Sequence, residues 1–309
     1  MDKKVILLTG SSGMVGKNIL EHPEKKRYFF LTPKSNELDL RDYNAVENYI
    51  KKYRPDMVIH AAGKVGGIQA NMSQPINFFV ENIDIGKNVI LASYKNGVKK
   101  LINFGSSCMY PKNFNGRLTE DLILKGELES TNEAYAIAKI AIARLCDYVM
   151  REDKNYHYKT LIPCNLYGRY DKFDQVNSHL VPAILHKLHQ AKTNNHAVEI
   201  WGDGSAKREF MYAGDMADMV FRAIEHFKYL PNYMNVGFGI DYTVSEYYQS
   251  AAEVVGFEGQ FIFNLKKPVG MTRKLVNIDR QIEWGWKPRV SLREGLKKTY
   301  DFYLSNINI

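Results

Sequence analysis

Residues 5–16 read Val5-Ile6-Leu7-Leu8-Thr9-Gly10-Ser11-Ser12-Gly13-Met14-Val15-Gly16. The apolar run from Val5 to Thr9 predicts a buried strand, the glycines predict a tight turn, and the residues that follow predict a helix. In such a unit the first glycine permits the turn, the second lets a pyrophosphate approach the backbone, and the third lets the helix pack on the strand. The motif alone is weakly specific, but it occupies the first strand of the chain. We therefore predict a dinucleotide site with Gly10, Ser12, Gly13, Met14, Val15 and Gly16.

Strand-like and helix-like segments alternate after this motif. Residues 28–31 and 57–62 have the composition of strands, residues 45–53 that of a helix, and Leu101 to Phe104 form another apolar run. Strands alternating with helices indicate a parallel sheet covered by helices on both faces. The sequence thus predicts an α/β fold with a Rossmann-like, doubly wound parallel sheet.

A smaller α/β substrate-binding lobe is expected to interleave with this sheet. We predict a helix near residues 179–191 and a strand at residues 198–201, and Asn235-Val236-Gly237 reads as a return to the first sheet. The predicted division assigns 1–165 and 231–250 to the cofactor domain and 166–230 and 251–309 to the second lobe.

The end of the second strand bears on the choice of cofactor. NAD-specific sites usually place an acidic residue there for the ribose 2′-hydroxyl, whereas this chain has Lys34 and Ser35. These residues suit a 2′-phosphate and favour NADP. Asp39 and Leu40 are expected near the adenine, with a solvated loop as the alternative for Asp39.

Three residues have the chemistry of a carbonyl reductase. Ser106 follows the strand that ends at Phe104, and Tyr135 and Lys139 are four residues apart, on one face of a predicted helix. A free tyrosine has a pKa near 10, so a neighbouring ammonium is needed for proton transfer near neutrality. The alternative for Tyr135 and Lys139 is a partly buried ring and a solvated charge.

The composition limits the classes of function. The 309 residues carry a formal charge of +8, yet no run of five basic residues occurs, which argues against nucleic acid. No apolar stretch reaches the length of a membrane helix or of a signal peptide, and three cysteines make no disulfide framework. We expect a cytoplasmic protein. The apolar helices at residues 75–94 and around Tyr135 suggest a homodimer, with core packing as the alternative.

Four segments together resemble the GDP-L-fucose synthases, which are extended short-chain dehydrogenase/reductases. They are His60-Ala61-Ala62-Gly63-Lys64-Val65-Gly66-Gly67-Ile68, Gly105-Ser106-Ser107-Cys108-Met109-Tyr110-Pro111, Tyr135-Ala136-Ile137-Ala138-Lys139 and Asn165-Leu166-Tyr167-Gly168. Asn177-Ser178-His179 and Arg208-Glu209-Phe210 extend the resemblance, which runs from Val5 to about Leu304.

The resemblance implies roles for individual residues. Ser106, Tyr135 and Lys139 would reduce a 4-keto sugar, and Cys108 and His179 would be the base and acid that invert C3 and C5. A thiol serves as such a base when a cation stabilises its thiolate, and histidine titrates in the range needed for its acid partner. Other cofactor contacts would come from Ala61, Ala62, Pro163, Asn165, Leu166 and His179, and substrate contacts from Ser107, Asn165, Lys187, Trp201, Arg208 and Lys274, without a metal.

Several loops depart from the family pattern. Ser12 replaces an arginine that helps to bind the NADP phosphate, and Met211-Tyr212-Ala213-Gly214-Asp215 replaces a His-Val-Asp-Asp segment. Further departures are Arg169-Tyr170-Asp171-Lys172, Phe173-Asp174-Gln175-Val176 and Pro268-Val269-Gly270-Met271-Thr272. These changes suggest a related 4-keto-6-deoxy sugar, including a heptose with one extra carbon.

The predicted function is an NADPH-dependent 4-reductase of a GDP-linked 4-keto-6-deoxy sugar, with 3,5-epimerisation left open, in GDP-sugar synthesis for a surface polysaccharide. One alternative is a C4 reductase alone, acting on a heptose that another enzyme has epimerised. An alternative of another class is a non-catalytic NADP-sensing regulator, which has no need of Ser106, Tyr135, Lys139 and Cys108 together. A dehydratase would need an Asp–Glu pair where Ser107-Cys108 stands.

Overall fold

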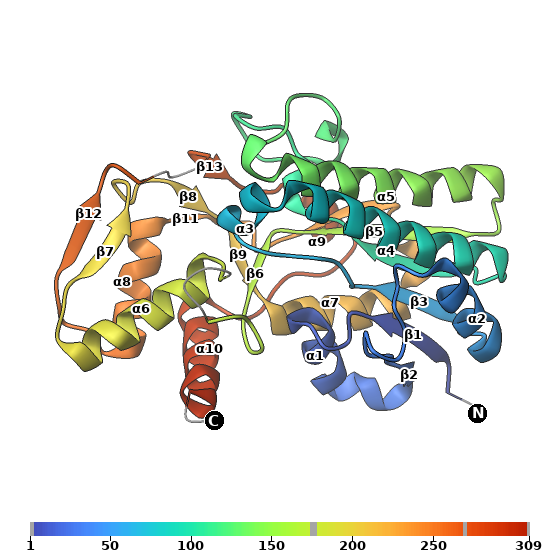
Figure 1. The fold of residues 1–309 in the computed structure, drawn as a ribbon, viewed down its shortest axis with the longest axis horizontal. Helices are drawn as coiled ribbons and strands as arrows, with labels where there is room; N and C mark the ends of the chain where they lie inside the picture. Colours follow the sequence, from blue (N-terminus) through green and yellow to red (C-terminus); the bar gives the residue numbers. More distant parts are fainter. Residues whose placement is uncertain (1–2, 174–177, 268–270, 308–309) are drawn as a thin grey trace.

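The computed structural model describes residues 3–173, 178–267 and 271–307. Its centre is a six-stranded sheet in which every neighbouring pair of strands is parallel (Figure 1). The strands across the sheet are β10 (Tyr233–Val236), β5 (His157–Pro163), β4 (Lys100–Phe104), β3 (Met57–His60), β1 (Val5–Thr9) and β2 (Phe29–Leu31). The predicted doubly wound parallel sheet is confirmed.

Helices cover both faces of the sheet (Figure 1). Side chains alternate between the faces of a strand: Ile6 and Leu8 pack in one hydrophobic cluster with Ile19, whereas Leu7 packs in another with Val46. Both faces are therefore buried, which explains the continuous apolar run of β1. One layer contains α1 (Met14–Glu21) and α7 (Ala213–Glu225), and the other contains α2 (Tyr43–Tyr53), α4 (Pro75–Lys95) and α5 (Glu133–Glu152).

A second lobe has its own hydrophobic core beside the sheet. Its helices are α6 (Leu180–Asn194), α8 (Val244–Val255) and α10 (Leu292–Asn306). Small sheets complete it: β7 (Val198–Trp201) with β12 (Phe261–Asn264), β6 (Asn165–Tyr167) with β9 (Phe210–Tyr212), and β8 (Lys207–Arg208) between β11 (Tyr242–Thr243) and β13 (Arg273–Lys274). The remaining α-helices of the described residues are α3 (Ile68–Ser73) and α9 (Asp279–Glu283).

The two lobes interleave differently from the predicted division. Helix α7 lies within the range assigned to the second lobe, but Met216 and Val220 pack in the cluster of the central sheet. Helix α8 begins within the range assigned to the cofactor domain, but Tyr247 and Ala251 pack in the core of the second lobe. Local sequence cannot distinguish these cases, because either helix presents an apolar face to whichever core it meets.

Some of the substitutions noted in the sequence lie outside the described residues. These are Asp174, Gln175 and Val176, the neighbouring Asn177, and the segment Pro268-Val269-Gly270. Within the described ranges, no helix combines the length and the apolar character that crossing a membrane requires.

Candidate active site

A cavity of about 1610 Å³ lies between the carboxyl ends of the central strands and the second lobe. Crevices at this edge of an α/β sheet are the usual place for ligands. All of the residues assigned to the cofactor, the substrate and the chemistry line this cavity, with Lys34 as the exception. Lys34 is exposed beside it, between Pro33 and Ser35, which do line it.

The glycine loop shapes one end of the cavity for a diphosphate. Gly10 has φ +73°, and a Cβ there would lie 2.7 Å from the backbone of Ala61 and Ala62. A Cβ on Gly13 would meet only Gly10 O, at 3.4 Å, so the loop leaves open space at this point. Gly13 also precedes α1, whose first-turn amides receive no side-chain cap. Free amides at a helix N-terminus together with open space fit a dinucleotide pyrophosphate.

Arg41 is a cavity residue that the sequence analysis missed. Its Nε and a terminal nitrogen donate to the Asp39 carboxylate at 2.9 and 2.7 Å, and this guanidinium holds the pKa of Asp39 below its usual value. Asp39 thus orients a cation toward the expected adenosine end. The available signal was a basic residue two positions after Asp39, beyond the end of the second strand where a ligand for the 2′-phosphate is usually expected.

Ser106, Tyr135 and Lys139 come together at the end of β4. The Ser106 side chain lies beside Tyr135 and acts to lower the pKa of its phenol, and Lys139 Nζ donates to Phe104 O at 2.9 Å. Lys139 Nζ lies 5.8 Å from the centre of the Tyr135 ring. Burial lowers the pKa of Lys139 to about 8. Burial also raises the pKa of Tyr135 above its ordinary value, and the neighbouring Cys108 adds to this effect. Tyr135 is consequently held in its proton-donating form.

Cys108 has two donors on its sulfur that the sequence did not reveal. Asn132 Nδ2 lies 3.2 Å from Sγ, and Lys274 Nζ lies 3.6 Å from it. Lys274 was expected to bind substrate, and it does line the cavity, but its ammonium also contacts the thiol. An ammonium beside a sulfur is the arrangement that stabilises a thiolate.

His179 faces the cavity from the second lobe. It is itself the N-cap of α6, without a side-chain capping bond, while Ser178 Oγ donates to Lys172 O at 2.6 Å. Ser178 therefore does not cap this helix. Burial lowers the pKa of His179, and Lys172 and Lys274 lower it further, so Lys274 influences both members of the predicted acid–base pair.

Further cations line the cavity from the second lobe. Arg208 on β8 pairs in register with Lys274 on β13, so one small sheet carries both. Burial lowers the pKa of Arg208 and of Lys187. Lys187 Nζ lies 5.5 Å from the centre of the Trp201 ring, and Lys267 Nζ, another residue that the sequence analysis missed, lies 5.1 Å from it. This group suits the phosphates of a nucleotide.

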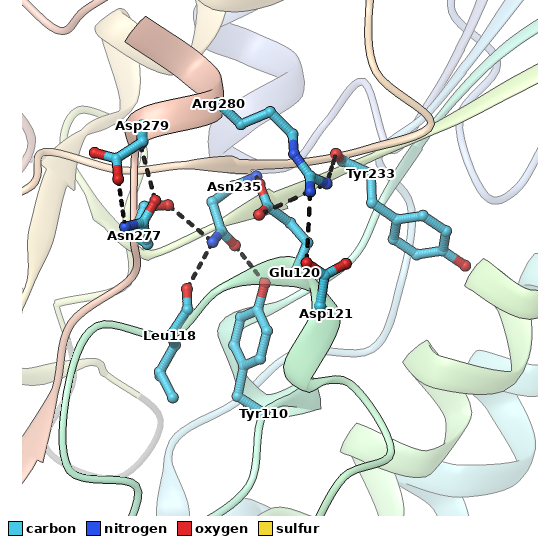
Figure 2. Close-up of polar contacts among 9 residues, drawn as sticks. All are labelled: Tyr110, Leu118, Glu120, Asp121, Tyr233, Asn235, Asn277, Asp279 and Arg280. Carbon is cyan, nitrogen blue, oxygen red and sulfur yellow. Dashed lines mark hydrogen bonds and ion pairs between the residues drawn. The ribbon is translucent and has the colours of Figure 1, made fainter. Parts of the chain in front are cut away.

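A buried polar network around Asn235 holds the segment that follows Cys108. Figure 2 shows Asn235 at its centre: Tyr110 Oη donates to Asn235 Oδ1 at 2.5 Å, and Asn235 Nδ2 donates to the backbone oxygens of Leu118 and Asn277 at 2.8 and 2.9 Å. Glu120 accepts from the Asn235 amide at 2.8 Å. These bonds join β10 to the segment after Cys108 and to the segment after Lys274.

Replacing Asn235 with alanine is expected to lower the free energy of unfolding by about 3 kcal/mol, because buried partners lose their hydrogen bonds. Urea denaturation followed by circular dichroism checks this, with an unchanged slope indicating the same unfolding transition. The exposed Asn115→Ala variant is the matched control. Equal stability of the two variants would contradict the proposed role of the network.

Comparisons with known proteins agree with this geometry. Residues 6–237 match the NAD dependent epimerase/dehydratase family. A GDP-L-colitose synthase of Yersinia pseudotuberculosis is 53% identical over 98% of this chain and 99% of its own, and a GDP-L-fucose synthase of Azorhizobium caulinodans is 46% identical over 98% and 97%. A GDP-mannoheptose C4 reductase from Campylobacter jejuni, solved with NADP bound, has a TM-score of 0.88 at 32% identity, covering 98% of this chain and 99% of that one.

Proposed function

Because the chain belongs to the NAD-dependent epimerase/dehydratase family, and within it to the GDP-L-fucose synthases and their relatives, we propose that it is an NADPH-dependent 4-reductase of a GDP-linked 4-keto-6-deoxy sugar. The observation that carries the proposal is the meeting of Ser106, Tyr135 and Lys139 in the cavity that the glycine loop opens. The names of the similar proteins, which include a GDP-sugar C4 reductase solved with NADP, support the cofactor and the substrate class.

The chain's own residues account for the proton side of the reduction. NADPH, when bound along the glycine loop, supplies the hydride for C4. Ser106 donates a hydrogen bond to the C4 oxygen and holds it beside Tyr135, which gives its proton to that oxygen as negative charge develops. The ammonium of Lys139 stabilises the resulting phenolate by its charge.

Cys108 and His179 supply the groups for inversion next to the ketone. A 4-keto group acidifies the protons on C3 and C5, and a Cys108 thiolate beside Lys274 can remove one of them. His179 lines the cavity from the opposite lobe and can return a proton to the other face of the sugar. We therefore include 3,5-epimerisation in the proposal, with a C4 reductase alone as the alternative.

Two relatives suggest more specific substrates. The 53% identical protein is named for GDP-L-colitose, a 3,6-dideoxy sugar, and a structural neighbour for a GDP-linked mannoheptose. The sequence identity is higher to the first protein, at 53% against 32%, which favours a 6-deoxyhexose, with or without the C3 hydroxyl, over the heptose that the altered loops suggested.

The decisive experiment offers the purified protein three GDP-linked 4-keto-6-deoxy substrates: the mannose derivative, its 3-deoxy analogue and the heptose. Oxidation of NADPH, followed by its absorbance, is expected with at least one of them and more slowly with NADH. Tight NADPH binding with no turnover on any GDP-linked ketone would contradict the reductase and support the regulator.

We also propose a homodimer, placed in the cytoplasm where NADPH and nucleotide sugars are made. Helices α4 and α5 pack side by side and expose apolar side chains. Among them, Phe79, Val80 and Ile137 are 39%, 45% and 42% exposed to solvent. Burying this stripe against a second copy would remove it from water. A molar mass in solution twice that of the chain is the expected result, and a monomeric mass would contradict it.

A further inference from the structure

We propose that Glu199 is the residue that selects guanine, its carboxylate accepting hydrogen bonds from the N1–H and the 2-amino group of the base. The inference rests on the proposed function and deepens it. The resemblance to the GDP-L-fucose synthases implied a GDP-linked sugar but no residue that recognises the base. Its support comes from the strand that carries Glu199, the contacts of its carboxylate and its place along the cavity.

Strand β7 turns Val198 and Ile200 toward the core of the second lobe and Glu199 and Trp201 away from it, although Val198 also forms part of the cavity lining. Val198 and Ile200 are 3% and 1% exposed and belong to the hydrophobic core of the second lobe. Because side chains alternate along a strand, Glu199 and Trp201 share the other face. Both line the cavity, so Glu199 is presented to whatever ligand occupies this end.

The Glu199 carboxylate is oriented but not neutralised. Asn264 Nδ2, on the adjacent strand β12, donates to Oε2 at 2.8 Å. None of the ion pairs formed within residues 3–173, 178–267 and 271–307 includes Glu199. The Glu199 side chain is exposed, so water solvates its carboxylate in the free protein, and a ligand with suitable hydrogen-bond donors can replace that water.

The length of helix α6 along the cavity indicates how far Glu199 lies from the residues assigned to catalysis. Leu180, Ala183, Lys187 and Gln190 line the cavity at helical spacing, and Leu180 and Gln190 are about 15 Å apart along the axis. The catalytic end begins next to Leu180, at His179, and Glu199 acts electrostatically on Lys187 near the other end. With Arg208 and Lys187 at the diphosphate, the base of a nucleotide sugar reaches Glu199.

The chemistry of the bases makes the carboxylate selective. A carboxylate only accepts hydrogen bonds, and guanine presents two adjacent donors, N1–H and the 2-amino group. Adenine and cytosine each present an amino donor next to a ring nitrogen that accepts, and uracil has one N–H between two carbonyls. Hypoxanthine keeps the N1–H of guanine but lacks the 2-amino group.

The test measures the affinities of GDP, IDP and ADP by calorimetry, with NADP present. Wild-type protein is expected to bind GDP at least about tenfold more tightly than IDP, since IDP lacks one bond to a charged acceptor. In Glu199→Gln and Glu199→Ala the GDP-to-IDP ratio is expected to fall toward one. Glu258→Gln, the same change at an exposed carboxylate of this lobe outside the cavity lining, should keep the wild-type ratio.

The outcomes separate this inference from the proposed function. A wild-type ratio retained in Glu199→Gln, or equal binding of GDP and IDP by wild type, overturns the role of Glu199 while NADPH oxidation with the GDP-linked ketone still upholds the reductase. Failure to bind any of the three nucleotides, together with no turnover, overturns both. Circular dichroism and NADP affinity confirm that each variant is folded.

Discussion

Replacing Tyr135 with phenylalanine is expected to lower the rate of ketone reduction by about a thousandfold, within the range of general acid catalysis. The change removes the proton donor to the C4 oxygen and keeps the ring, which packs edge-on against Phe78 at 6.4 Å. Ser106 and Lys139 keep their places, because Ser106 Oγ accepts from the Cys108 amide at 3.2 Å and Lys139 donates to Phe104 O. Single-turnover oxidation of bound NADPH measures the chemical step directly.

The control for this variant is Tyr229→Phe, the same change at a side chain that is 72% exposed. NADPH affinity, measured by fluorescence, should be similar in both variants, because the loss concerns proton transfer. A Tyr135→Phe enzyme that retains a tenth of the wild-type rate would show that another group protonates the C4 oxygen, and the assignment of Tyr135 would then be wrong.

The pH dependence of the wild-type reaction follows from the same residues. Lys139 must carry its proton to stabilise the phenolate, and burial lowers its pKa to about 8. The kcat/KM for reduction reports the free enzyme, so it is expected to be level below this pH and to fall as the pH rises through it. Tyr135 adds no loss in this range, because its raised pKa keeps it protonated.

Elements with a clear local sequence pattern were predicted correctly. The first strand was predicted with its observed bounds, Val5–Thr9, and the predicted strand at 198–201 is β7. Both have local patterns: an apolar run ending in glycine, and apolar side chains alternating with Glu199 and Trp201. The proximity of Tyr135 and Lys139 could also be predicted, since a helix puts residues four apart on one face.

The groups that contact Cys108 could not be predicted from local sequence patterns. Lys274 reaches the thiol because β13 pairs with β8, a contact between segments far apart in the chain, and no local pattern encodes that register. Asn132 lies at the start of α5 and reads in the sequence as an ordinary capping residue. Only the three-dimensional structure places both donors beside the sulfur of Cys108.

These donors lead to the second large expected effect. Wild-type protein with NADP and the GDP-linked ketone in heavy water is expected to incorporate deuterium next to the ketone, since no hydride is available to complete reduction. Replacing Cys108 with serine should slow this exchange by a factor of about 10² to 10⁴, the usual contribution of a general base. A serine hydroxyl is a far weaker acid than a thiol, so the ammonium of Lys274 cannot generate a comparable base from it.

Tyr135→Phe is the matched control, because it should slow reduction about a thousandfold and keep the exchange, the reverse of Cys108→Ser. Lys274→Met should also slow exchange, and Lys274→Arg should retain part of it, since a cation remains beside the sulfur. Nuclear magnetic resonance of the recovered sugar locates the deuterium at C3 or C5.

Exchange that survives in Cys108→Ser would exclude the thiol as the base. Wild-type protein that reduces the ketone without exchange would be a C4 reductase alone, and Lys274 would then serve the substrate rather than the thiolate.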